Sequence, residues 1–193
     1  MLHIIKGINE KGWSPATSTN YSYRTDDDHI VISKSGVDKE FFSAGDFIKI
    51  DLSGKLLSKY ESSKTSAETL IHCFIYQQFP STKCILHTHS LASTILPAMK
   101  QNSTTLTFEG YEIIKGIKGN DTHLTTLNLP VFDNEQDMSK FCEALKSRLN
   151  ELGNFAFLMN KHGLYAWGDS ITEAKCHLET WEFLLNCELT LNQ

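Results

Sequence analysis

The sequence contains no apolar run close to the roughly twenty residues that a helix needs to cross a bilayer. It also has no C-x-x-C pair, no internal repeat, no low-complexity tract and no linker rich in proline, serine or glycine. These absences argue against a membrane protein and against a chain divided by a linker. With 193 residues, of which 40 % are hydrophobic and 21 % charged, we expect one globular domain over residues 1–193.

Positive charge is also scarce, because 18 lysines and arginines face 23 aspartates and glutamates, a net charge of −5. Duplex binding needs a basic patch, so we expect no nucleic-acid partner, whereas a small anionic substrate stays compatible. Residues 1–11 carry Glu10 and lack a continuous apolar stretch, which predicts no secretion signal and a cytoplasmic protein. The five cysteines are an odd number, and most occupy apolar positions, so we expect reduced thiols.

Alternating strand and helix patterns are present in irregular order. Residues 29–32 and 47–52 predict strands joined as a β-meander, and residues 66–79 predict a helix capped by Ser66 and ended by Pro80. A helix is expected over residues 135–152, with Gly153 as its stop, followed by a hairpin of residues 155–159 and 163–167. Ser170 and Glu173 form a capping box for the last helix. The order favours a three-layer α/β/α fold with a mixed, mostly antiparallel sheet.

The most informative segment is His87-Thr88-His89, which closes an apolar run at residues 83–86. Side chains at i and i+2 of a strand project from one face, so both imidazoles can share one ion. Such a pair also arises as hydrogen-bonded strand-end residues that bind nothing. His162, in the predicted hairpin turn beside Gly163, is the candidate third ligand; there the missing Cβ would let an ion or ligand approach.

Three imidazoles that leave a fourth position open are typical of a catalytic zinc site. The other histidines have weaker claims. His72 and His177 fall on predicted helices and are expected to be packing or surface residues, and His3, His29 and His123 have no partner at ligand spacing.

Five motifs occur in the order found in class II aldolases, and the chain resembles that superfamily over almost its whole length. The motifs are residues 12–20 (GWSPATSTN), 35–39 (SGVDK), 66–69 (SAET), 87–90 (HTHS) and 161–168 (KHGLYAWG). Within the superfamily, the first motif, residues 110–116 (GYEIIKG) and the YAWG ending resemble the methylthioribulose-1-phosphate dehydratases.

The resemblance implies a zinc lyase of methionine salvage that removes water from 5-methylthioribulose 1-phosphate, giving 2,3-diketo-5-methylthiopentyl 1-phosphate. It implies a Zn²⁺ ion on His87, His89 and His162, and Glu112 as the catalytic acid or base. Glu112 would need a partly dry pocket to raise its pKa. A surface glutamate paired with Lys115 is the plain alternative, and Glu109 lies close enough to compete.

The resemblance also implies a phosphate site and a homotetramer whose active sites are completed by a neighbouring subunit. The candidate substrate-binding residues are Glu68, Ser18, Asn20, Ser35, Gly36 and Ser66. Glu68 is interpreted as lying beside the substrate or metal, or else as only stabilising the first turn of its helix. Two departures from the family pattern affect phosphate binding: Thr19 stands where glycine is usual, and Ala67 where a second serine is common.

Two other readings stay open. A sugar-phosphate aldolase or 4-epimerase of the same superfamily would share the metal chemistry and differ at C4. A non-enzymatic module like the adducin head, which resembles this fold without its zinc site, is disfavoured by the three histidines.

Overall fold

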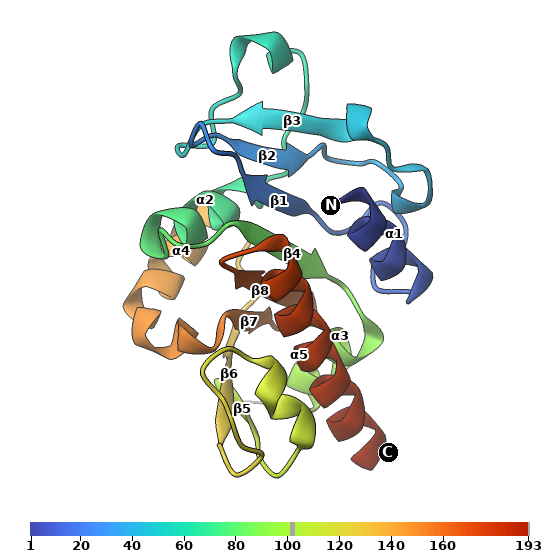
Figure 1. Ribbon diagram of the computed structural model, residues 1–193, viewed down its shortest axis with the longest axis vertical. Coiled ribbons are helices and arrows are strands. Elements are labelled where there is room, and N and C mark those ends of the chain that lie inside the picture. Colours follow the sequence, from blue (N-terminus) through green and yellow to red (C-terminus); the bar gives the residue numbers. More distant parts are fainter. Residues whose placement is uncertain (101–102, 193) are drawn as a thin grey trace.

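The computed structural model describes residues 1–100 and 103–192 and contains one eight-stranded sheet (Figure 1). The strands lie in the order β3-β2-β1-β4-β8-β7-β6-β5. They are β1 (Tyr21–Arg24), β2 (Ile30–Ser33), β3 (Phe47–Ile50), β4 (Cys84–Thr88), β5 (Thr105–Phe108), β6 (Leu127–Phe132), β7 (Ala156–Met159) and β8 (Gly163–Gly168). Among the described strands, only β6 and β7 pair in parallel, and the other neighbours are antiparallel. The sheet is therefore mixed and mostly antiparallel, as predicted.

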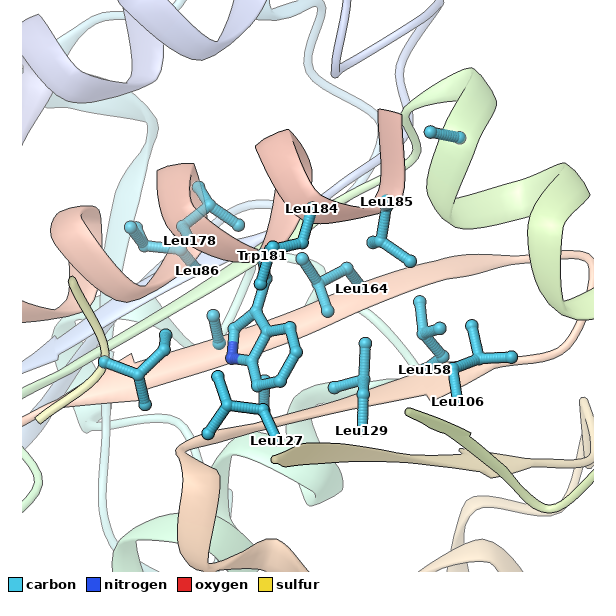
Figure 2. Packing of buried hydrophobic residues seen from close by; sticks show 14 of the residues in the cluster. Leu86, Leu106, Leu127, Leu129, Leu158, Leu164, Leu178, Trp181, Leu184 and Leu185 are labelled. Atoms are coloured by element: carbon cyan, nitrogen blue, oxygen red, sulfur yellow. The ribbon is translucent and has the colours of Figure 1, made fainter. Parts of the chain in front are cut away.

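Helices cover both faces of this sheet. They are α1 (Leu2–Glu10), α2 (Thr69–Gln78), α3 (Leu91–Met99), α4 (Met138–Ser147) and α5 (Ile171–Leu191). On one face, Trp181 and its neighbours on α5 pack against leucines of β4, β6 and β8 (Figure 2). On the other face, a second buried cluster joins α2 and α4 to β2, β3 and β7. These two apolar layers confirm the predicted α/β/α arrangement.

Several predicted elements are confirmed. Residues 29–32 and 47–52 contain β2 and β3, which pair antiparallel, and residues 155–167 form the β7–β8 hairpin. Ser170 caps α5 by accepting a hydrogen bond from the Glu173 amide at 3.0 Å. The Glu173 carboxylate accepts from the amide of Asp169 and not of Ser170, so the capping box is shifted by one residue.

Two helix predictions were wrong at their ends. The expected helix 135–152 ends as α4 at Ser147, because Arg148 adopts φ −121° and donates to the carbonyl groups of Val131 and Thr104. A separate 3-10 helix, Leu149–Asn154, follows. The helix expected from Ser66 begins at Thr69, since the Ser66 hydroxyl accepts from the Glu68 amide in a local turn before the helix. α1, β1, β5 and β6 were not predicted.

Among the described residues, no helix combines the length and the apolar character required to traverse a membrane. This agrees with the sequence, in which no apolar run of that length occurs.

Candidate metal centre

The three predicted ligands come together where β4 ends beside the β7–β8 turn. β4 is buried along its length and pairs with β8, with His87 opposite Tyr165. His162 lies in the turn immediately before β8. His87, His89 and His162 each offer one ligand atom, and these atoms lie within 4.8 Å of one another. The sequence prediction that the i, i+2 pair would meet His162 is therefore borne out by the geometry.

The Nε2 atoms are the ones that converge. His87 Nε2 and His89 Nε2 lie 2.7 Å apart, and the ring centres of His89 and His162 are separated by 4.6 Å. The opposite edge of two rings is occupied: Nδ1 of His87 donates to the Leu164 carbonyl at 2.9 Å, and Nδ1 of His162 contacts Asn134 Oδ1 at 3.1 Å. Acceptors at Nδ1 fix the tautomer that leaves the Nε2 lone pair free for a metal.

Burial keeps His87 and His89 in the form that binds metal. His87 is fully buried, and desolvation lowers its pKa well below the ordinary value of 6.5. Desolvation also lowers the pKa of His89 to about 4. Because neutral imidazole is the ligand form, the residues present fit a divalent cation with three nitrogen donors and an open position.

Glu68 is the carboxylate of the centre. Its Oε1 lies 3.2 Å from His162 Nε2, and its Oε2 lies 3.6 Å from His87 Nε2. Burial alone would raise the pKa of this carboxyl, but the neighbouring imidazoles of His162 and His87 and a hydrogen bond from Asn20 lower it well below its usual range. The carboxylate is therefore ionised, and it borders the three histidines, as expected for a metal- or substrate-adjacent group.

Gly163 has a different reason to be glycine from the one expected. A Cβ at this position would lie 2.0 Å from the Thr88 carbonyl oxygen and 3.0 Å from Cδ2 of His89. The close neighbour is thus the end of β4 and not an ion or ligand. The missing side chain lets the hairpin turn press His162 against the His87-Thr88-His89 segment.

A cleft of about 390 Å³ opens over the histidines. It is lined by Pro15, His89, Thr94, Asn134, Gln136, Lys161 and His162. Two imidazoles on its wall and several amide or cationic groups around it make this cleft suitable for a small polar molecule.

The predicted phosphate-binding residues lie on three loops, and hydrogen bonds connect these loops to one another. The Ser35 amide donates to the Lys64 carbonyl at 3.1 Å, which brings residues 35–36 beside the segment of Ser66. Lys39 is buried and donates to the carbonyl groups of Ser18 and Val37. Desolvation lowers the Lys39 pKa to about 8. Only neutral donors were expected here, so this buried cation is an addition to the predicted phosphate site.

The polar side-chain groups of two of these residues already form hydrogen bonds within the chain. The Ser18 hydroxyl donates to the Pro15 carbonyl at 2.6 Å, and Asn20 bonds to Glu68 and His72. Thr19, which replaces the family's glycine, still adopts φ +71°. Its hydroxyl is hydrogen bonded to the buried Tyr21 hydroxyl at 2.8 Å. Such a left-handed conformation costs about 1–3 kcal/mol in a residue with a side chain, so this bond offsets part of the strain.

Glu112 is not brought to this centre within the chain. It opens the 3-10 helix Glu112–Gly116, which packs on α5: the Cys176 thiol contacts the Gly116 carbonyl at 3.4 Å. The Glu112 side chain is 73 % exposed, pairs with Lys115 and lies 3.6 Å from His123. The hydrogen bond from Lys115 lowers its pKa. One chain does not provide the dry pocket that an acid role requires.

Sequence reasoning missed three residues around the ligands. Tyr165 stacks on His87 with 3.9 Å between ring centres and donates to Glu68 at 2.9 Å. The buried Glu182 of α5 accepts from the Thr88 hydroxyl at 2.5 Å, and burial raises its pKa to about 7. Asn134 orients His162. Only Tyr165 carried a signal, because it belongs to the YAWG motif; nothing in the local sequence marks the others.

Comparison with other proteins agrees with this architecture. The chain matches the Class II Aldolase and Adducin N-terminal domain over residues 1–189. It is 54 % identical, over 96 % of its length and 88 % of the relative's, to the methylthioribulose-1-phosphate dehydratase of Picosynechococcus sp.. It is 41 % identical to the protein of that name from Xanthomonas campestris pv. campestris, over 99 % of this chain and 87 % of the relative.

Solved structures show the same fold. YgbL of Escherichia coli superposes with a TM-score of 0.82 at 22 % identity, covering 99 % of this chain and 87 % of YgbL. The l-fuculose-1-phosphate aldolase of Thermus thermophilus gives 0.77 at 21 % identity, covering 98 % and 92 %. With the sheet, the three histidines and the match over residues 1–189 in agreement, this chain belongs to the family of class II aldolases and adducin N-terminal domains.

Proposed function

We propose that this protein is a methylthioribulose-1-phosphate dehydratase, which removes water from 5-methylthioribulose 1-phosphate in methionine salvage in the cytoplasm. The observation that carries the proposal is the 54 % identity, over nearly the full chain, to a relative of that name. The convergent Nε2 atoms of His87, His89 and His162 support it, because dehydration of a ketose phosphate needs stabilised negative charge next to the carbonyl. On this proposal residues 1–193 act as one zinc domain.

Zinc is the ion we propose for the three histidines, and when bound it would supply Lewis-acid polarisation of the C2 carbonyl, which makes the C3 proton acidic. The chain's own residues hold and orient the substrate. Glu68, ionised and fixed beside His162, accepts a hydrogen bond from a substrate hydroxyl. The loops of Ser18, Asn20, Ser35, Gly36 and Ser66 receive the phosphate through backbone amides and the hydroxyl groups of Ser35 and Ser66, next to the buried charge of Lys39.

Glu112 is proposed as the acid that protonates the leaving hydroxyl at C4, and as the candidate base at C3. Because its side chain is exposed and its contacts within one chain are Lys115 and His123 and not the three ligand histidines, we propose that a neighbouring subunit delivers it. Contact with a second subunit would remove water from the carboxyl and raise its pKa toward the range that an acid needs at neutral pH. A homotetramer with shared active sites meets this requirement.

A class II aldolase or 4-epimerase is the second candidate, since it would use the same metal centre. The likeness to the l-fuculose-1-phosphate aldolase, at 21 % identity, concerns the fold alone. An adducin-like scaffold is disfavoured because the metal-ligand geometry is intact.

The deciding experiment is incubation of the purified protein with 5-methylthioribulose 1-phosphate, followed by mass spectrometry of the products. Loss of one water supports the dehydratase. Dihydroxyacetone phosphate, from cleavage between C3 and C4, would show an aldolase instead. Metal analysis of the same preparation tests the ion: protein with no bound divalent metal, and no thermal stabilisation by added zinc, would support the scaffold.

A further inference from the structure

A buried row of polar side chains leads away from the metal centre into the space between β1 and α2. Glu68 contacts Asn20, and Asn20 contacts Nε2 of His72. Nδ1 of His72 lies 2.7 Å from the Ser22 hydroxyl, which lies 2.9 Å from the Tyr76 hydroxyl. His72 is completely buried and contacts none of the three metal ligands through a hydrogen bond in the described chain. The proposed mechanism gives this histidine no role.

The direction of every hydrogen bond in this row follows from the placement of Asn20. Its Nδ2 amide group, which only donates, faces Glu68 Oε2. The carbonyl Oδ1 of Asn20 therefore faces His72 and only accepts, which requires a proton on Nε2 of His72. Nδ1 of the neutral ring then accepts from Ser22, and the Ser22 oxygen accepts from Tyr76.

The other protonation states of His72 do not fit this arrangement. A ring with its proton on Nδ1 would set the Nε2 lone pair against Asn20 Oδ1, two acceptors in contact. A doubly protonated ring would be a cation without solvent, and desolvation lowers the pKa of His72 to about 4. At neutral pH the structure accommodates one tautomer.

We infer that His72 is a positioning residue that holds the Asn20 amide with its N–H groups, and not its carbonyl, toward Glu68. The consequence appears at the metal centre. Asn20 and Tyr165 both donate to Glu68 Oε2, which leaves Oε1 directed at His162, 3.2 Å away. If the amide turned over, its carbonyl would face the carboxylate, and Glu68 would move away from that position.

The first test is spectroscopic and does not depend on the proposed function. Long-range ¹⁵N–¹H correlation spectra of the ¹⁵N-labelled protein report which ring nitrogen of each histidine carries a proton, and the His72→Gln variant assigns the signal. We expect a neutral ring protonated at Nε2 at pH 7. A ring protonated at Nδ1, or at both nitrogens, would overturn the inference.

The second test asks whether His72 acts through Asn20, and it rests on the dehydratase proposal. His72→Leu removes the donor and should lower kcat/KM on the order of tenfold, whereas His72→Gln keeps an N–H near the Nε2 position and should retain most of the activity. In an Asn20→Ala background, His72→Leu should cost no further activity. Equal losses in both backgrounds would show a purely structural role.

Two controls separate the possible failures. Metal content and thermal unfolding of each variant show whether a loss comes from an empty metal site or from poor folding. If the unaltered protein does not dehydrate the substrate, the proposed function fails while the tautomer result still stands. If His72→Leu does not fold, the comparison of His72→Gln with the unaltered protein and the ring spectrum still decide.

Discussion

The metal centre and the Glu112 segment differ in how completely one chain builds them. At the centre, His87 is fully buried, and Asn20 and Tyr165 hold Glu68 by hydrogen bonds. Glu112, by contrast, is 73 % exposed on the surface 3-10 helix Glu112–Gly116, and its partner Lys115 is itself exposed. The contrast teaches that one chain positions the three candidate metal ligands but leaves Glu112 in water, which is why the proposal above assigns its environment to a second subunit.

Removing a metal ligand should have the largest effect. His87→Ala deletes one of three donors and opens a buried cavity, so we expect loss of bound metal and a fall in kcat/KM on the order of 10³-fold or more. Metal analysis and dehydratase assays measure both. His3→Gln, on the exposed face of α1, is the control and should change neither. Full activity of His87→Ala without bound metal would show that the buried histidines are not needed for the reaction.

Glu112→Gln should separate chemistry from structure. Loss of the carboxyl is expected to lower kcat roughly 10²- to 10⁴-fold, the usual contribution of general acid–base catalysis. Metal content and thermal stability should stay unchanged, because this side chain is exposed and its ion pair with Lys115 is a surface one. Glu109→Gln is the matched control. If Glu109→Gln were inactive and Glu112→Gln active, the acid would be Glu109.

Mixing two inactive variants tests whether the acid comes from another subunit. Glu112→Gln supplies intact histidines, and His87→Ala supplies an intact Glu112. After subunits are unfolded and refolded together in equal amounts, about a quarter of the sites in a random oligomer would combine both intact halves. Activity should then reappear at about that fraction. No recovery, with mixed oligomers demonstrated by mass spectrometry, would place Glu112 and the histidines in the same subunit.

A smaller effect, on stability, is expected at the buried side. Gly163→Ala places a Cβ 2.0 Å from the Thr88 carbonyl oxygen, so the turn and β4 must separate. We expect a loss of about 1–3 kcal/mol in the free energy of unfolding, measured in urea, together with weaker metal binding. Gly7→Ala in α1, where a Cβ meets nothing within 4 Å, is the control and should not destabilise the protein. Equal stability of the two variants would contradict the close contact.

The sequence predicts those elements whose pattern is local, and it fails where an element depends on contacts between residues far apart in the chain. His87 and His89 were found because two residues on one strand face share a period of two. β7, β8 and the start of α5 carry strong local patterns. β1 is four residues with a polar Ser22 and Arg24, and β6 contains Pro130, so neither shows a clean strand signal. The end of α4 depends on contacts between Arg148 and distant backbone groups.

The same limit applies inside the site. Asn20 and His72 are 52 residues apart, and Thr88 and Glu182 are 94 apart, so no local pattern pairs them. His72 was predicted to be a packing or surface residue. It is buried, but its hydrogen bonds connect it to the carboxylate beside the ligands. A polar residue on the buried face of a helix is the one sequence feature that could have raised the question.

The smallest expected effect concerns stability against pH and compares buried His72 with an exposed histidine. Desolvation lowers the His72 pKa from 6.5 to about 4, although the Glu68 charge raises it somewhat. Between those values the unfolded chain binds a proton that the folded one does not, so stability falls as pH falls and levels off below about pH 4. The shift corresponds to about 3 kcal/mol at most.

Urea unfolding of the metal-free protein and of His72→Gln measures this effect. The difference in unfolding free energy between the two should change by up to that amount between pH 7 and pH 4, and the variant gains relative stability at low pH. The other histidines are present in both proteins, so their contributions to the difference cancel. His3→Gln is the control at an exposed position. A curve for His72→Gln parallel to that of the unaltered protein would mean that His72 takes up its proton as readily in the folded state as in the unfolded chain.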